Sequence, residues 1–184
     1  MCSFLFTNAE VNDFDYTNHY MKFRGPDATS SINVNEYTFA HNILSITGNF
    51  TPQPFVDHDD EIVCVYNGQI YNYDDYGDYS SDGECIIPTY KKFGERAFVT
   101  LDGEFAIVLA DFKINLLHLV TDPFATKPLW YGIDGDKIGV ASYESAVKSL
   151  GFRKVIKQDA NKILTFNLET KEFIKEMPTY EFIL

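Results

Sequence analysis

Short apolar runs, bounded by polar and turn-forming residues, predict β-strands along most of the chain. Glu104–Asp111 and Leu116–Asp122 are almost continuously apolar, and the stretch Phe112–Asn115 separates them. This pattern is typical of a hairpin whose strands are covered on both faces. Further strands are predicted at Ser3–Thr7, Glu36–Ala40, Leu44–Thr47, Glu61–Tyr66, Leu129–Tyr131 and Lys137–Ala141, with a final hairpin of Lys162–Asn167 and Glu172–Lys175.

Helix signals occur between these strands. Ser81 and Glu84 have the spacing of a capping box, which predicts a helix that Pro88 should kink or shorten. The other predicted helices are Phe14–Phe23, a turn at Glu95–Thr100, and a helix capped by Ser142 that runs to Leu150. Loops are expected at Gly48–Pro54 and Tyr73–Ser80. Strands and helices in this order predict a layered α+β fold in a single domain spanning residues 1–184.

Asn67-Gly68 stands between two β-rich runs, Glu61–Tyr66 and Gln69–Asn72. Asn-Gly in that context is the strongest short-range hairpin signal, because both residues tolerate the positive φ of a type I′ turn. The pattern alone therefore predicts a plain turn at Asn67-Gly68.

Composition limits the possible partners and location. The net charge is −12 and the isoelectric point is near 4.6, which disfavours nucleic acid and anionic membrane as partners, because both require basic patches. We see neither a basic leader nor an apolar run long enough to span a membrane. Cys2, Cys64 and Cys85 are odd in number and widely spaced, which suits a reducing cytoplasm. The four histidines lack metal-ligand spacing, so neither a metal nor another cofactor is expected.

Cys2 is the candidate nucleophile. If Met1 is removed, Cys2 carries a thiol and a free α-amine, and an amine that titrates near pH 8 can take the thiol proton. The alternative is that position 2 is a cysteine by coincidence. Cys64 and Cys85 lie in an apolar run and at a helix start, where packing roles are expected.

Eight short motifs, in register from Met1 to about Ala146, resemble the glutaminase domain of class II glutamine amidotransferases, in the asparagine-synthetase branch. The resemblance implies the Ntn-hydrolase fold, a four-layer αββα sandwich of two antiparallel sheets. The motifs are Met1-Cys2-Ser3, Arg24-Gly25-Pro26-Asp27, His41 with Leu44-Ser45-Ile46, Gln53-Pro54, Asn67-Gly68-Gln69-Ile70-Tyr71-Asn72, Ser81-Asp82-Gly83-Glu84, Gly103-Glu104-Phe105-Ala106, and Asp122-Pro123-Phe124 with Lys127-Pro128-Leu129.

The resemblance also implies a chemistry, which is hydrolysis of the side-chain amide of glutamine. Cys2 would form a thioester and release ammonia, while the Asn67 side chain and the Gly68 N–H would form the oxyanion hole. Asp82 would bind the substrate ammonium, although a carboxylate at a helix N-terminus can equally serve the helix itself. Gln69, Ile43 and Leu44 complete the implied substrate-binding set.

Two of these positions depart from the family pattern. Where the family has His-x-Arg-Leu-Ser-Ile, with the arginine on the substrate carboxylate, this chain has Ile43; where asparagine synthetases have Asn-Gly-Glu, it has Gln69. The pocket thus loses one charge of each sign, which is expected if its ligand is less zwitterionic than glutamine. Arg24 or Lys22 could supply a substitute cation.

Three functions follow as alternatives. The first is a stand-alone glutaminase that supplies ammonia to a separate, ATP-dependent partner resembling asparagine synthetase, because the chain lacks that family's Ser-Gly-Gly-x-Asp-Ser loop. The second is an amidase that uses Cys2 on another amide. The third is an inactive module that binds a synthetase. Cys2 and Asn67-Gly68 favour the first two, whereas Ile43 favours the last two.

Overall fold

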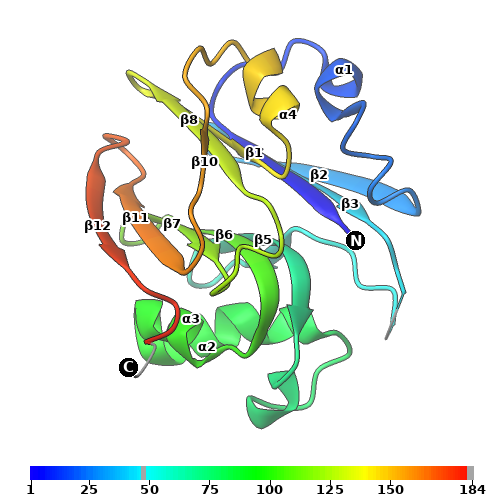
Figure 1. Cartoon of the computed structure of the whole chain (residues 1–184), viewed down its shortest axis with the longest axis vertical. Helices are drawn as coiled ribbons and strands as arrows, with labels where there is room; N and C mark the ends of the chain where they lie inside the picture. The colour runs from blue at the N-terminus through cyan, green and yellow to red at the C-terminus, as the bar shows by residue number, and fades with distance from the viewer. Residues whose placement is uncertain (47–48, 182–184) are drawn as a thin grey trace.

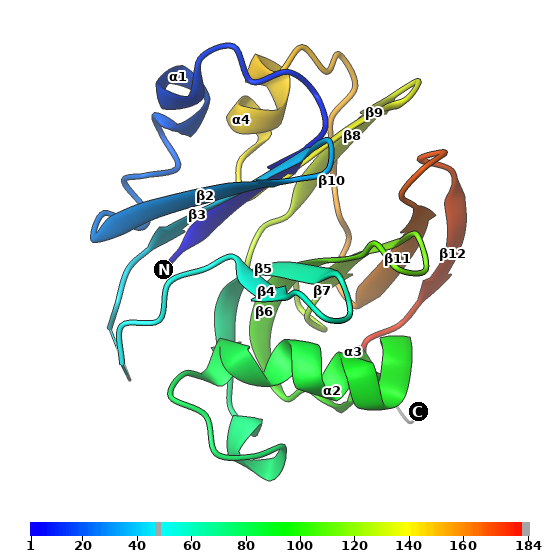
Figure 2. The same cartoon turned by 180° about the vertical axis from the view of Figure 1, so that it is seen from behind.

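Two six-stranded antiparallel sheets are stacked face to face in the computed structural model, which describes residues 1–46 and 49–181 (Figure 1). The first sheet has the order β10-β8-β9-β1-β3-β2 and the second β12-β11-β7-β6-β5-β4. In both views the N-terminus lies at the open end between the sheets, beside β5 (Figures 1 and 2).

The first sheet is built around β1, which pairs with β3 on one side and β9 on the other. Its strands are β1 (Ser3–Thr7), β2 (Ala28–Val34), β3 (Tyr37–Ile43), β8 (Trp130–Asp134), β9 (Lys137–Ala141) and β10 (Ile156–Lys157). The second sheet consists of β4 (Phe55–Asp57), β5 (Ile62–Ile70), β6 (Gly103–Asp111), β7 (Leu116–Thr121), β11 (Lys162–Asn167) and β12 (Phe173–Met177). The expected hairpin of β6 and β7 is confirmed, as is that of β11 and β12.

Helices cover the outer face of each sheet, which gives the four layers that were expected (Figure 2). On the first sheet lie α1 (Phe14–Asn18) and α4 (Glu144–Ser149). On the second lie α2 (Ile86–Phe93) and α3 (Ala97–Thr100), with the 3₁₀ turns η1 (Tyr73–Asp75), η2 (Asp82–Cys85) and η3 (Gly94–Arg96). Pro88 falls in the first turn of α2, where its missing N–H removes no helical hydrogen bond.

Alternation along the strands decides which side chains face the space between the sheets. In β1, Phe4 and Phe6 are buried in the core between the sheets, whereas Leu5 packs against the outer helices. Cys2 is two residues before Phe4, so its side chain is on the same face and points toward the second sheet. In β5, Val63 and Val65 face the same core and Cys64 faces α2, so Asn67 and Gln69 point toward the first sheet.

Several sequence predictions are wrong. Asn67-Gly68 is not a turn: β5 runs straight through it and pairs with β6 as far as Gly103. β3 is one continuous strand through Ile43 rather than two pieces, and β2 was not predicted. Helix α1 ends at Asn18, and α4 is capped by Tyr143 while Ser142 accepts a hydrogen bond from Phe4 N–H. Of the predicted segments Leu44–Thr47 and Gly48–Pro54, Thr47 and Gly48 lie outside the described residues.

Candidate active site

The Cys2 thiol is half-buried at the beginning of β1, where the two sheets come together. The N–H of Leu44, in the segment just after β3, donates to Cys2 Sγ at 3.4 Å. The backbone N–H of Cys2 donates to Asn67 Oδ1 at 3.0 Å, across the gap to the second sheet. The Leu44 backbone just after β3 and the Asn67 side chain in β5 therefore hold Cys2 between the two sheets.

Asn67 is 1% exposed within β5, and only one end of its amide has a partner. Because Cys2 N is a donor, the atom facing it must be the oxygen, so the amide orientation is fixed. Among the described residues no group accepts a hydrogen bond from the buried Nδ2. Leaving such a group unpaired typically costs about 1–3 kcal/mol. The structure thus presents a free donor beside the thiol.

Gly68 lies where the backbones of β5 and β6 are in close contact. A Cβ on Gly68 would fall 2.2 Å from the backbone oxygen of Glu104, so no other residue fits without moving the sheet. The opposite residue, Phe105, exchanges its backbone hydrogen bonds with Asp122 instead. The Gly68 N–H therefore points away from β6. On that side β4 pairs with β5 only at Ile62–Cys64, so it does not reach Gly68.

Gln53 and His41, which belong to the quoted sequence motifs, hold the backbone of β5 at Tyr66. The sequence analysis did not predict this role. Gln53 Oε1 accepts the Tyr66 N–H at 2.7 Å. His41 Nε2 lies 3.1 Å from Tyr66 O and donates to it, which connects β3 to β5. Burial lowers the pKa of His41 to about 4, so the ring is neutral at pH 7. The backbone of Tyr66 is thereby fixed one residue before Asn67.

Asp82 lies at the start of η2, and its Oδ2 accepts the Ile70 N–H at 2.7 Å and the hydroxyl of Tyr66. These bonds tie the start of η2 to the end of β5, whereas the capping box of this helical segment is formed by Ser81 and Glu84. Burial is the main cause of the raised pKa of the Cys2 thiol, and the charge of Asp82 adds to the shift. The structure therefore allows both roles considered for Asp82, in the helix start and beside the thiol.

The remaining predicted substrate-binding residues surround the same end of the sandwich. Ile43 is 9% exposed and lies on the face of β3 that carries Phe39 and His41, which is directed toward the second sheet. Leu44 contacts the thiol through its backbone. Gln69 is exposed, two residues beyond Asn67 on the same face of β5. All seven predicted residues thus gather at this end.

Burial raises the pKa of the Cys2 thiol, although the Leu44 N–H partly opposes the shift and Arg24 opposes it more weakly. The thiol is therefore protonated at neutral pH and requires a base. Arg24 also contacts Met1, with Nη2 3.2 Å from the Met1 sulfur, and its buried Nε has no partner among the described residues. Of the two proposed substitute cations, Arg24 contacts Met1, the residue before Cys2, whereas Lys22 is exposed.

Two absences apply to the described residues. No group of three or more His, Cys, Asp or Glu side chains there could hold a metal ion. No helix in the same residues is both long and apolar enough to cross a membrane.

Cys64 and Cys85 are fully buried free thiols, and burial raises the pKa of Cys85 to about 12, in agreement with the packing roles expected for them.

The two stacked antiparallel sheets, covered by helices on both outer faces, form the Ntn-hydrolase fold that was expected. Residues 1–179 match the family model described as a glutamine amidotransferase domain, and the chain belongs to this family. Its fold is shared with the glutamine phosphoribosylpyrophosphate amidotransferase of Bacillus subtilis, with a TM-score of 0.74 over 97% of this chain and 49% of that one, at 17% identity.

Two curated relatives show the range of names in the family. A protein of Penicillium rubens named amidase chyE is 30% identical over 92% of this chain. A protein of Saccharomyces cerevisiae named asparagine synthetase [glutamine-hydrolyzing] 1 is 32% identical over 71% of it. The matched segments are 27% and 24% of those proteins, so this chain spans about a quarter of their length.

Proposed function

We propose that this chain hydrolyses the side-chain amide of glutamine or a glutamine-like molecule, with Cys2 as the nucleophile once Met1 has been removed. The observation that carries the proposal is the buried Asn67 Nδ2, which has no partner among the described residues and belongs to the side chain that holds Cys2 N at 3.0 Å. A free donor at that place matches the need of an oxyanion formed next to the thiol.

Removal of Met1 would turn Cys2 N from an amide into an α-amine without changing its neighbour. The amine could donate one hydrogen to Asn67 Oδ1 and use its lone pair to take the thiol proton, which the raised pKa of the thiol makes necessary. The sulfur would then attack the amide carbon. Asn67 Nδ2 and the Gly68 N–H would stabilise the oxyanion, and each such donor is worth about 10²–10³ in rate.

Collapse of this intermediate breaks the carbon–nitrogen bond and releases ammonia, with the proton returned by the α-ammonium. The acyl group stays on Cys2 as a thioester. Water, deprotonated by the same amine, then attacks the thioester and frees the acid and the thiol. Asp82 would hold the substrate ammonium, and the half-buried position of Cys2 would limit competing access of solvent.

A second candidate, an amide other than glutamine, is favoured by Ile43. Its aliphatic side chain lies at the site, where the family pattern has an arginine for the substrate carboxylate, and an unpaired buried carboxylate is costly. The relative named amidase chyE, which matches nearly the whole chain, supports the same candidate. Arg24 is the cation that could keep glutamine as the substrate, because it lies beside Met1 and Cys2.

We further propose that residues 1–179, and with them the whole chain, act as one catalytic domain in the cytoplasm. Its ammonia would pass to a separate ATP-dependent partner related to asparagine synthetases. The support is that the yeast relative combines asparagine synthesis and glutamine hydrolysis in its name, and that the family model matches residues 1–179 of this chain.

The experiment is an intact-mass measurement of the purified protein with and without a glutamine analogue that alkylates thiols. The proposal expects a mass that begins at Cys2 and one added label, which is absent from Cys2→Ala. Labelling by a simple acetamide reagent but not by the glutamine analogue would favour the second candidate. A retained Met1 with no labelling at Cys2 would favour an inactive binding module.

A further inference from the structure

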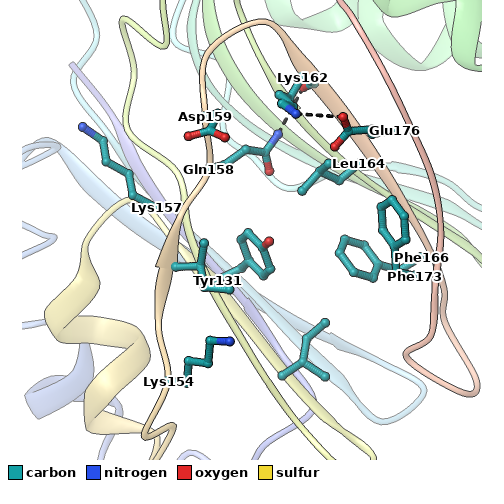
Figure 3. Close-up of a pocket in the computed structure, with 12 residues that line it drawn as sticks. Tyr131, Lys154, Lys157, Gln158, Asp159, Lys162, Leu164, Phe166, Phe173 and Glu176 are labelled. Carbon is teal, nitrogen blue, oxygen red and sulfur yellow. Dashed lines mark hydrogen bonds and ion pairs between the residues drawn. The ribbon is translucent and has the colours of Figure 1, made fainter.

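A cavity lies at the edges of the two sheets that are formed by β8, β10, β11 and β12. In Figures 1 and 2 these strands are on the side of the molecule away from the N-terminus. The cavity opens between β8 and β10 of one sheet and β11 and β12 of the other, and its volume is about 380 Å³ (Figure 3). Small-molecule sites commonly measure roughly 300–1,000 Å³. Its described lining residues do not include Cys2, Asn67 or Asp82, so it is distinct from the candidate active site.

Part of this cavity is lined by residues at the edge of the hydrophobic core between the sheets. Leu164 and Phe166 of β11 belong to the core between the sheets, and Tyr131 of β8 packs against it. The rings of Tyr131 and Phe166 have centroids 6.0 Å apart. Phe173 of β12 is 54% exposed at the mouth and contacts Phe166 edge to face. Aromatic surface left open in this way favours a flat, apolar ligand.

One buried polar atom faces this apolar space. Gln158 is 3% exposed, and its Nε2 donates to the backbone oxygens of Leu119 at 2.9 Å and Lys162 at 3.1 Å. Because both partners are acceptors, the NH₂ must face them, so the amide oxygen is directed into the cavity, as Figure 3 shows. That Oε1 has no partner among the described residues. An unpaired buried acceptor favours a ligand that brings a hydrogen-bond donor.

The cavity lining carries three lysines and two carboxylates, Asp159 and Glu176, in a chain whose net charge is −12. Figure 3 shows the Lys154 ammonium directed toward the cavity, at the end opposite Gln158. The other two lysines are engaged elsewhere. Lys162 pairs with Glu176 at 2.8 Å, and Lys157 lies over the Trp130 ring at 6.0 Å. A ligand anion would therefore meet Lys154.

We propose that this cavity binds a small aromatic carboxylate whose ring carries a hydrogen-bond donor. The ring would lie among Tyr131, Leu164 and Phe166, its donor would reach Gln158 Oε1, and the carboxylate would pair with Lys154. The three features are at separate places in the cavity, so together they select the length and polarity of the ligand. Binding involves no covalent step and does not depend on Cys2.

The test uses isothermal titration calorimetry with indole-3-acetate, whose ring N–H and carboxylate match this arrangement. Two comparison probes each lack one feature: naphthalene-1-acetate has no ring donor, and tryptamine carries a cation in place of the carboxylate. We expect saturable binding of one indole-3-acetate per chain. Naphthalene-1-acetate should bind about tenfold more weakly, since one hydrogen bond is lost, and tryptamine more weakly still, because Lys154 would repel it.

Matched variants place the probe in the cavity. Lys154→Gln and Phe173→Ala should each weaken indole-3-acetate several-fold. Lys137→Gln and Phe50→Ala should leave its affinity unchanged, because neither Lys137 nor Phe50, which is also 54% exposed, lines the cavity. Cys2→Ala should bind like the wild type. Three results would each overturn the proposal: no saturable binding, equal binding of all three probes, or affinity that Lys154→Gln and Phe173→Ala leave intact.

Discussion

The proposed chemistry depends most directly on the two ends of the Asn67 side chain. Asn67→Asp keeps an acceptor 3.0 Å from Cys2 N and replaces the unpaired Nδ2 donor by an oxygen. Loss of one oxyanion donor lowers kcat by about 10²–10³, or ~2.7–4 kcal/mol. The new carboxylate would also stabilise the protonated α-amine and so weaken the base. We therefore expect kcat for glutamine hydrolysis to fall by at least about 10²-fold.

Stability separates this prediction from a structural effect. Asn67 is 1% exposed, so a carboxylate there costs free energy of folding, but its contact with the α-ammonium offsets much of that cost. We expect the thermal midpoint to change little. The assay is steady-state release of glutamate by protein that mass spectrometry shows to begin at Cys2, combined with thermal unfolding of the same sample.

Asn33→Asp is the matched control for Asn67→Asp. Asn33 is also in a strand and its Oδ1 also accepts a hydrogen bond, from Thr38 Oγ1 at 2.8 Å, but it is exposed and lies on β2. The same chemical change there should leave both turnover and thermal midpoint near those of the wild type. If folded Asn67→Asp keeps kcat within tenfold of the wild type, the oxyanion-hole role is refuted.

Three further predictions concern the thiol, the substrate and pH. Cys2→Ala should abolish turnover in a stable protein, whereas Cys64→Ala should keep turnover and lose about 1–2 kcal/mol of unfolding free energy; measurable turnover by Cys2→Ala would exclude the mechanism. Ile43→Arg should lower KM for glutamine roughly tenfold or more without changing kcat, because it restores a hydrogen bond to the substrate carboxylate. An unchanged KM would mean that Arg24 already binds this carboxylate in the wild type. Burial lowers the pKa of His118 from 6.5 to about 4. Between pH 4 and pH 6.5 the His118 ring is therefore protonated in the unfolded chain and neutral in the folded one. Stability from this group is present above pH 6.5 and is lost as pH falls to 4, by about 3 kcal/mol, and chemical denaturation of His118→Gln should show a shallower decline.

Central strands were easier to predict than edge strands. The hairpin of β6 and β7 is apolar on both faces because both strands lie in the middle of the second sheet, so its pattern is continuous. Strand β2 is at the edge of the first sheet and alternates between exposed and partly exposed residues, and β4 has three residues. Such strands are stabilised by pairing with a neighbour, which no local pattern records.

Asn67-Gly68 was misread as a turn because the reason for its glycine is not local. Gly68 is required by the backbone of Glu104, which lies 2.2 Å from where a Cβ would stand. The neighbour responsible is 36 positions away in the sequence, so turn propensity was the only signal available. The candidate site residues were found through motifs in register, whereas the positioning bonds of His41 and Gln53 to Tyr66 needed the folded structure.

The division of the candidate site between the sheets has a consequence for the order of events during folding. Cys2, Ile43 and Leu44 belong to the first sheet and its margin, while Asn67, Gly68 and Gln69 belong to the second. A chain with only one sheet formed would carry a thiol without its donor, or a donor without its thiol. A slip of one sheet by a single residue, about 3.3 Å, would also break the 3.0 Å contact between Cys2 N and Asn67 Oδ1. Activity should therefore report on the finished stacking of the sheets and be absent from partly folded intermediates.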